Sequence, residues 1–188
     1  MALDTLEPSS GRAALPIGAR GPDFAGLQGT DGRLYSSADF ADSDNVVLIF
    51  SSNRCPTAKA YAQRMNALQA EYGPRGVQLV AINSNDPHLY PDESFARMIE
   101  RAAEDEYRFP YLVDAGQQLA RALGASCTFH VFVLDSDRRL RYQGRFDDSR
   151  IATRVTRHDL RDALDDILAG RDVRVTSTRP FGCSLDLV

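Results

Sequence analysis

Strand and helix patterns alternate along the first half of the chain. Unbroken apolar runs at residues 45–50 (NVVLIF) and 77–83 (VQLVAIN) have the length and content of strands that are covered on both faces. Between these runs, apolar residues recur at spacings of three and four and predict a helix that stops at residues 73–74; they are Ala58, Tyr61, Met65, Leu68 and Tyr72. Strands that alternate with helices in this way favour a layered α/β arrangement.

The flanking segments complete this pattern. Residues 21–36 predict two short strands around a Gly/Asp turn, followed by a helical turn to residue 40. Later elements are expected as a helix from an Asp92 cap to about Glu106, a short helix at 117–123, a strand pair at 130–135 and 140–144, and a helix from a Thr156–Asp159 capping box to Gly170. We therefore predict an α/β fold with a central mixed β-sheet, helices on both faces and an N-terminal β-hairpin extension.

Composition and charge define the class of protein and narrow its partners. The 188 residues suit one domain, which we place at residues 21–170 between a flexible arm (1–20) and a C-terminal tail (171–188). A net charge of -4 without a basic run argues against nucleic acid and anionic membrane surfaces as partners. No apolar run approaches the roughly 20 residues of a membrane span. The first residues lack the basic start and apolar stretch of a signal peptide, so we expect a cytoplasmic protein.

Cys55 is the strongest candidate for a reactive group. It lies where the run at 45–50 ends and a helix begins, and Pro56 follows at the position that favours the first helical residue. The sulfur of an N-cap cysteine lies near the partial positive charge of the helix end, which stabilises a thiolate. Arg54 and Lys59 are expected to act in the same direction. The alternative is a small buried residue that closes the strand.

Several motifs resemble one known family: GPDFAG, NVVLIFSSNRCPTAKAY, AINSND, FPYLVD and a late GCS. They are similar to those of the peroxiredoxin-like proteins of the alkyl hydroperoxide reductase/thiol-specific antioxidant superfamily, over about residues 21–184. The resemblance implies a thioredoxin fold and a thiol-dependent oxidoreductase that acts on a disulfide or a peroxide. It implies no cofactor, and it implies a thioredoxin-like or low-molecular-weight thiol as reductant. A homodimer is compatible with it.

The chain departs from the family pattern at three positions. Ala58 stands where a thioredoxin has its second cysteine, so Cys55 needs another thiol for resolution. Ser52 matches the hydroxyl of the peroxiredoxin motif and is expected to bond the sulfur or the substrate, whereas Leu48 replaces its proline. Phe129 replaces the cis-proline of thioredoxins. Because a cis bond before another residue costs about 3 kcal/mol, we expect a trans bond there.

The other thiols leave several interpretations open. An odd count of three cysteines argues against a secreted disulfide scaffold. In this fold Cys127 should face the start of the Cys55 helix, either as its resolving partner or as a packed, reduced residue. Cys183, on the tail, is a further candidate for resolution. The alternative to an enzyme is a redox-silent binding module, or a copper or zinc carrier that uses Cys55, Cys127 and His130.

Overall fold

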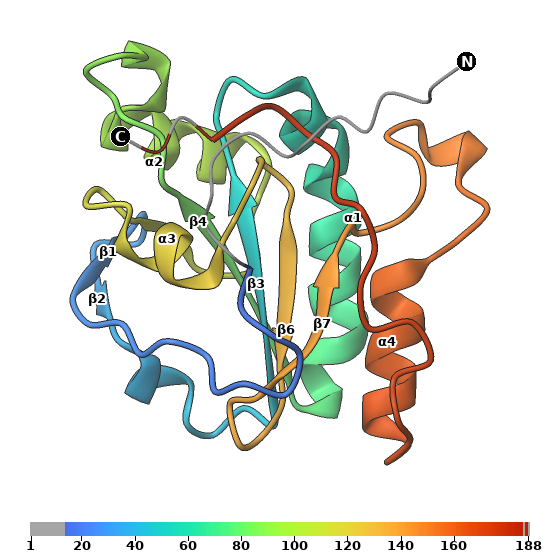
Figure 1. Cartoon of the computed structure of the whole chain (residues 1–188). Helices are drawn as coiled ribbons and strands as arrows, with labels where there is room; N and C mark the ends of the chain where they lie inside the picture. Colours follow the sequence, from blue (N-terminus) through green and yellow to red (C-terminus); the bar gives the residue numbers. More distant parts are fainter. Residues whose placement is uncertain (1–13, 186, 188) are drawn as a thin grey trace, which may run out of the picture.

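The computed structural model describes residues 14–185 and 187, and these contain a seven-stranded mixed sheet with the order β2-β1-β5-β4-β3-β6-β7 (Figure 1). The strands are β1 (Leu27–Gly29), β2 (Leu34–Tyr35), β3 (Asn45–Ser51), β4 (Val77–Asn83), β5 (Tyr111–Val113), β6 (Val131–Leu134) and β7 (Leu140–Gly144). The central β3 pairs in parallel with β4 and antiparallel with β6. The β1–β2 hairpin extends the sheet beyond β5. The predicted mixed sheet and its hairpin extension are confirmed.

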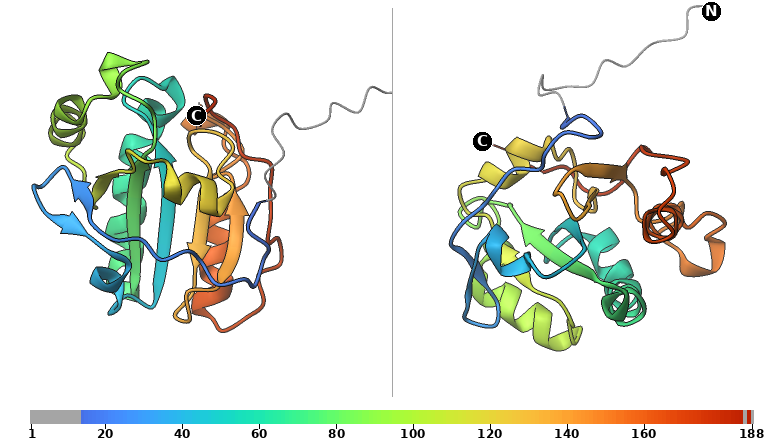
Figure 2. Two further views of the ribbon diagram at one scale, coloured as in Figure 1. Left: turned by 60° about the vertical axis from the view of Figure 1, so that its left-hand side comes forward. Right: turned by 90° about the horizontal axis from the view of Figure 1, so that it is seen from below.

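Helices cover both faces of this sheet (Figure 2). They are α1 (Pro56–Tyr72), α2 (Phe95–Glu104), α3 (Gln118–Leu123) and α4 (Asp159–Leu168), with 3-10 turns at Ser37–Phe40, Gly73–Arg75, Pro91–Glu93 and Ala152–Arg154. Side chains of α1, α2 and α4 join one buried cluster, and those of α3 join the other. None of the helices in the described part of the chain is long and apolar enough to cross a membrane.

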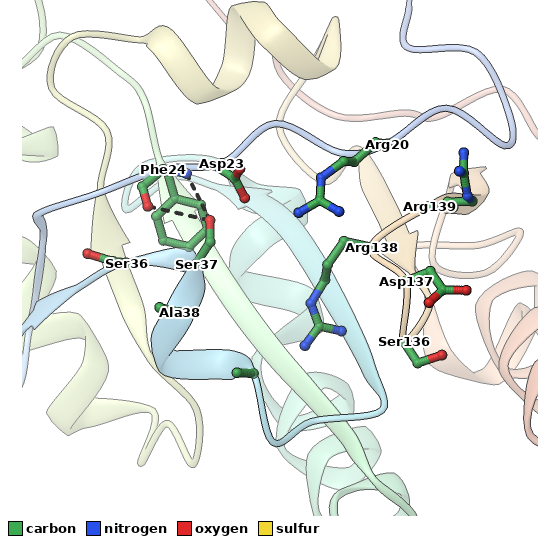
Figure 3. Close-up of a pocket in the computed structure, with 11 residues that line it drawn as sticks. Arg20, Asp23, Phe24, Ser36, Ser37, Ala38, Ser136, Asp137, Arg138 and Arg139 are labelled. Atoms are coloured by element: carbon green, nitrogen blue, oxygen red, sulfur yellow. Dashed lines mark hydrogen bonds between the residues drawn. The ribbon is translucent and has the colours of Figure 1, made fainter.

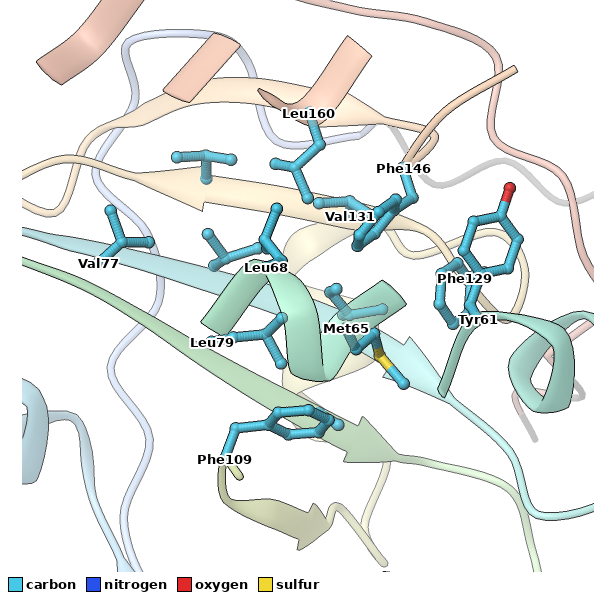
Figure 4. Close-up of a cluster of buried hydrophobic side chains, with 14 of the residues drawn as sticks. Tyr61, Met65, Leu68, Val77, Leu79, Phe109, Phe129, Val131, Phe146 and Leu160 are labelled. Atoms are coloured by element: carbon cyan, nitrogen blue, oxygen red, sulfur yellow. The ribbon is translucent and has the colours of Figure 1, made fainter. Parts of the chain in front are cut away.

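Alternation along β3 explains how one strand serves two cores. Val47 and Ile49 face α1, and Val46, Leu48 and Phe50 face α3, and all five are at most 3% exposed. Figure 4 shows the cluster on the α1 side, where Met65 and Leu68 of α1 lie over the sheet. A strand covered on both faces is an unbroken apolar run, which is why the sequence predicts β3 well. The rigid β3–α1 junction is where Cys55 lies.

Some predicted boundaries were wrong. β5 was not predicted, because three residues after Pro110 carry no periodic signal. Asp92 does not cap α2; it belongs to the 3-10 turn Pro91–Glu93, and Ser94 is the N-cap. At α4 the N-cap is His158, and the Thr156 hydroxyl bonds Asp148 instead of the helix.

Both ends of the described chain lie against the domain. Leu15 donates its backbone N–H to Leu123 O (3.2 Å), and Gly18 donates to Leu140 O (2.7 Å), so the last part of the predicted arm is docked. Residues 1–13 of that arm lie outside the described residues. The tail, red in Figure 1, runs from α4 to the opposite end of the sheet, where α1 begins. Ser177 and Ser184 form isolated bridges with Gln143 and Cys127 on the way.

Candidate active site

The β3–α1 junction holds Cys55 in the geometry of a helix N-cap. Cys55 has an extended backbone (φ -68°, ψ 121°), and Pro56 occupies the first turn of α1. This placement follows from the sequence, because proline has no N–H to lose at a helix start and its fixed φ suits the helix. The residue is buried, with 1% of its surface exposed. Its sulfur therefore lies at the positive end of a 17-residue helix and away from bulk solvent.

A buried carboxylate fixes the loop that leads into Cys55. Glu93, 1% exposed, accepts hydrogen bonds from the Ser52 hydroxyl, the Asn53 N–H (2.8 Å), the Arg54 N–H (3.4 Å) and the Asn83 side-chain amide (2.8 Å). These four donors satisfy the carboxylate without a cation. The Ser52 oxygen also accepts the Cys55 N–H (3.0 Å). Ser52 thus holds the backbone of Cys55, and its predicted bond to the sulfur is not formed.

Replacing Glu93 with glutamine is expected to loosen this loop. An amide NH₂ would face two of the four donors that the carboxylate now accepts, and a buried unpaired donor costs about 1–3 kcal/mol. We expect the free energy of unfolding, measured by urea denaturation, to fall by that amount. Asp92→Asn changes the exposed neighbouring carboxyl and is the matched control. Equal stability of Glu93→Gln and the control would show that the carboxylate is not what holds the loop.

The segment before β6 faces Cys55 from across the sheet end. The Thr128–Phe129 bond is trans, as predicted, because there is no cis peptide bond among the residues that the structure describes. Phe129 has a left-handed backbone (φ 67°), donates its N–H to Phe50 O (2.5 Å) and stacks on Tyr61 with ring centroids 4.3 Å apart. A proline at this position could not donate that bond. Phe129 therefore ties the segment to β3 and α1, and Thr128 faces the sulfur.

The Thr128 hydroxyl joins the tail to the catalytic candidate. It lies 3.1 Å from Cys55 Sγ, to which it donates, and it accepts the Cys183 backbone N–H at 2.9 Å. The Cys183 carbonyl lies 3.1 Å from the same hydroxyl but already accepts the Thr128 N–H at 2.8 Å. A hydroxyl has one proton to donate. Because the Cys183 carbonyl already has a donor, the Thr128 hydroxyl proton is available to the Cys55 sulfur.

The surroundings make Cys55 more acidic than an ordinary thiol. Burial opposes ionisation, but hydrogen bonds from the Cys183 thiol, the Thr128 hydroxyl and the Ala58 N–H outweigh it and lower the pKa of Cys55 to about 7. The pKa values of the other two thiols are shifted in the opposite direction. Burial raises the pKa of Cys127 to about 11, and burial together with the bond to Cys55 raises the pKa of Cys183 to about 11. Cys55 is thus the thiol that ionises first.

The remaining predicted site residues lie around this centre without touching the sulfur. The Arg54 guanidinium lies over the ring of Tyr90, 3.8 Å from its centroid. Lys59 is exposed and lies in a shallow, charged pocket beside Arg54 and Arg97. Neither side chain is hydrogen-bonded to Cys55, and the main causes of its lowered pKa are the hydrogen bonds described above.

The proposed metal site is not formed. His130 is 5% exposed, its ring lies 4.2 Å from that of Phe132, and its Nδ1 accepts the Ser126 N–H at 3.3 Å. Burial lowers the pKa of His130 to about 4. Residues 14–185 and 187 contain no group of three His, Cys, Asp or Glu side chains that could hold a metal ion. Cys55, Cys127 and His130 therefore do not converge as ligands.

A large cavity lies away from the cysteines. It has a volume of about 800 Å³ and lies near the turn between β6 and β7, beside Arg20, Arg138 and Arg139 (Figure 3). The guanidinium of Arg138 is occupied by the carbonyls of Phe40 (2.5 Å) and Ser43 (2.9 Å). Pairing of Val46 with Leu134 places this turn at the end of β3 opposite to Cys55. The cavity is thus no part of the thiol site.

Sequence reasoning missed Glu93 and Thr128. Glu93 lies in a polar loop, where an acid usually faces solvent. Thr128 directly precedes Phe129, the residue that replaces a cis-proline, and this position is the signal that could have identified it.

Comparison with known proteins identifies the family to which the chain belongs. The chain belongs to the Redoxin family, whose model matches residues 16–164. Its fold is the thioredoxin fold. A hypothetical protein from Sinorhizobium meliloti has a similar structure, with a TM-score of 0.87 and 38% identity over 94% of this chain and 97% of that one.

The names of two further relatives state an activity. Thiol-disulfide oxidoreductase ResA from Geobacillus thermodenitrificans is 25% identical over 83% of this chain and 80% of its own length. Peroxidoxin BcpB from Mycobacterium tuberculosis has a similar fold, with a TM-score of 0.57 and 19% identity over 81% of this chain and 94% of that one.

Proposed function

We propose that this protein is a thiol–disulfide oxidoreductase in which the Cys55 thiolate attacks a disulfide. The observation that carries the proposal is the Thr128 hydroxyl 3.1 Å from a helix-capping sulfur whose pKa is about 7. A thiol with a pKa near neutrality is partly ionised and still nucleophilic, which is the optimum for exchange. The resemblance to a thiol-disulfide oxidoreductase over four fifths of its length favours a disulfide over a peroxide.

The reaction begins with exchange at one sulfur. The Cys55 thiolate attacks one sulfur of the substrate disulfide, a Cys55–substrate disulfide forms, and the other substrate sulfur leaves as a thiolate. A second thiol then attacks this mixed disulfide and releases the rest of the substrate. Electrons to regenerate the protein come from a thiol reductant, of the thioredoxin-like or low-molecular-weight kind.

Disulfide exchange with a matched pair of variants tests the proposal. With dithiothreitol as reductant, the full-length protein should accelerate reduction of a disulfide-bonded peptide. Cys55→Ser should fall to the rate of dithiothreitol alone, because serine cannot form the mixed disulfide, whereas Cys127→Ser should keep the wild-type rate.

A parallel assay of hydrogen peroxide consumption separates the two substrates. We expect no more peroxide loss than with Cys55→Ser. Peroxide consumption that depends on Cys55, without any peptide reduction, would reassign the substrate. Equal peptide reduction by wild type and Cys55→Ser would refute the proposal.

A further inference from the structure

Backbone pairing holds Cys183 in one position beside Cys55. The Cys183 N–H bonds the Thr128 hydroxyl at 2.9 Å, and its carbonyl accepts the Thr128 N–H at 2.8 Å. Ser184 forms an antiparallel bridge with Cys127. Bonds to both its N–H and its carbonyl fix the backbone of Cys183, and with it the position of its Cβ atom. The Thr128 hydroxyl that accepts the Cys183 N–H lies 3.1 Å from the Cys55 sulfur, and the two thiols shift each other's pKa.

Two glycines allow the tail to come this close. A Cβ atom on Gly182 would lie 1.9 Å from the Thr128 carbonyl oxygen. Only glycine, which has no Cβ atom, avoids this clash. The second glycine is Gly144 of β7, which an earlier part of the tail contacts. A Cβ atom on Gly144 would lie 2.1 Å from the Thr178 hydroxyl oxygen. The tail is therefore fitted against the sheet at two places along its path. The close fit at both places indicates that the tail has a defined position on the sheet.

The two sulfurs differ in access. Cys55 is 1% exposed, whereas Cys183 is exposed. Cys183 also lines a small polar cavity of about 80 Å³ together with Arg54, Thr128 and Ser184, and Cys55 does not line it. An external thiol therefore meets Cys183 first.

We propose that Cys55 and Cys183 form an internal disulfide couple, and that a reducing thiol enters this couple at the exposed sulfur of Cys183. The proposal rests on Cys55 being the nucleophile of the proposed function. It makes the tail a part of the reaction, with Cys55 as the inner sulfur and Cys183 as the outer one.

Closure of the couple follows the first exchange. Once Cys55 carries the substrate, the Cys183 thiol gives its proton to the departed substrate thiolate and attacks the Cys55 sulfur. The Cys55–substrate bond breaks, the Cys55–Cys183 bond forms, and the second substrate thiolate leaves. In total one substrate disulfide gains two electrons from the two protein sulfurs, one proton from Cys183 and one proton from the solvent, which had taken up the Cys55 proton on ionisation.

Reopening runs through the other sulfur. An external thiolate attacks Cys183, the internal S–S bond breaks, and Cys55 leaves as a thiolate; a second external thiol then frees Cys183 and becomes part of an external disulfide. The more acidic thiol is the better leaving group. The pKa of Cys55, about 7, against about 11 for Cys183 supports this direction.

Cys127 is poorly placed for the same role. It is near enough that the charges of Cys55 and Cys183 raise its pKa, yet it has no hydrogen bond to Cys55, and its contact is the Ser126 hydroxyl at 4.0 Å. The bridge from Cys127 to Ser184 makes it a support for the tail. We therefore assign resolution to Cys183 in place of Cys127.

Stoichiometric oxidation tests the couple. Reduced full-length protein is treated with one equivalent of dithiodipyridine, released thiopyridone is measured by absorbance, and peptides are mapped after the remaining thiols are blocked. Wild type and Cys127→Ser should each release two thiopyridones per chain and lose two hydrogens in a Cys55–Cys183 link. Cys183→Ser should release one and retain the other on Cys55.

The outcomes separate the couple from the proposed function. A stable adduct on Cys55 of wild type, or a Cys55–Cys127 link, would overturn the couple and leave Cys55 as the nucleophile. Failure of Cys55 to react in both wild type and Cys183→Ser would overturn the proposed function itself.

The entry point is tested on the oxidised protein. Oxidised wild type is mixed with glutathione and quenched in acid at short times before peptide mapping. Glutathione on Cys183, with Cys55 free, is the expected result. Glutathione on Cys55, with Cys183 free, would reverse the assignment of inner and outer sulfurs.

Discussion

Thr128→Val is expected to raise the pKa of Cys55 and slow its reaction at neutral pH. Valine has nearly the shape of threonine but removes the hydroxyl that donates to Cys55 Sγ at 3.1 Å. A hydrogen bond to a charged group contributes about 1.5–3 kcal/mol. Each 1.4 kcal/mol is a tenfold change in an equilibrium constant, so the acidity constant of Cys55 should fall roughly ten- to hundredfold.

The direction of the pKa shift follows from which form of Cys55, thiol or thiolate, the Thr128 hydrogen bond stabilises. A donor at the sulfur favours the thiolate, so its loss favours the neutral thiol and moves ionisation to higher pH. The measurement is the rate of iodoacetamide alkylation of Cys55 against pH, read by peptide mapping, with a wild-type midpoint expected near the pKa of about 7. Thr128→Ser keeps a hydroxyl and should restore the wild-type midpoint. A wild-type midpoint in Thr128→Val would show that the hydroxyl does not tune Cys55.

Gly182→Ala is expected to detach the tail and disable closure of the couple. The new Cβ would lie 1.9 Å from a backbone oxygen of Thr128, which cannot rotate away as a side chain can. Loss of a fixed near-attack geometry lowers an intramolecular rate by roughly a hundredfold for a displacement of about 1 Å. The rate of the second thiopyridone release should fall by about this factor, and Cys55 should become accessible to bulky maleimides.

A second glycine provides the matched control for this variant. A Cβ on Gly116 would meet Gln118 at an ordinary 3.6 Å, so Gly116→Ala should keep both release rates. If Gly182→Ala released the second thiopyridone as fast as wild type, backbone pairing at Thr128 would not be what positions Cys183.

The fold was readable from the sequence where burial imposes a pattern. The run NVVLIF is a strand between two cores, and Pro56 marks the start of a helix directly after Cys55. The strand β5 was not readable, because three residues are too few to show a period. Its place is set by pairing with β4 and β1.

Of the site residues, Cys55 could be predicted from the sequence because local structure positions it. Cys55 acquires its setting from the strand and helix on either side of it. Glu93 and Cys183 reach it from segments that lie 38 and 128 positions away (93 − 55 and 183 − 55), and those segments have no periodicity that could fix their path. Contacts of that kind depend on the finished packing, so the sequence pointed to Cys127 as the resolving partner, with Cys183 as a further candidate.

That separation also sets an order of events during synthesis. Every strand and helix that the structure describes after Cys55 is synthesised before Cys183. All strands and helices of the described fold are therefore present in the chain before the proposed partner of Cys55 has been made. The proposed disulfide joins no two of these strands and helices to each other, and its reduction should leave the sheet folded.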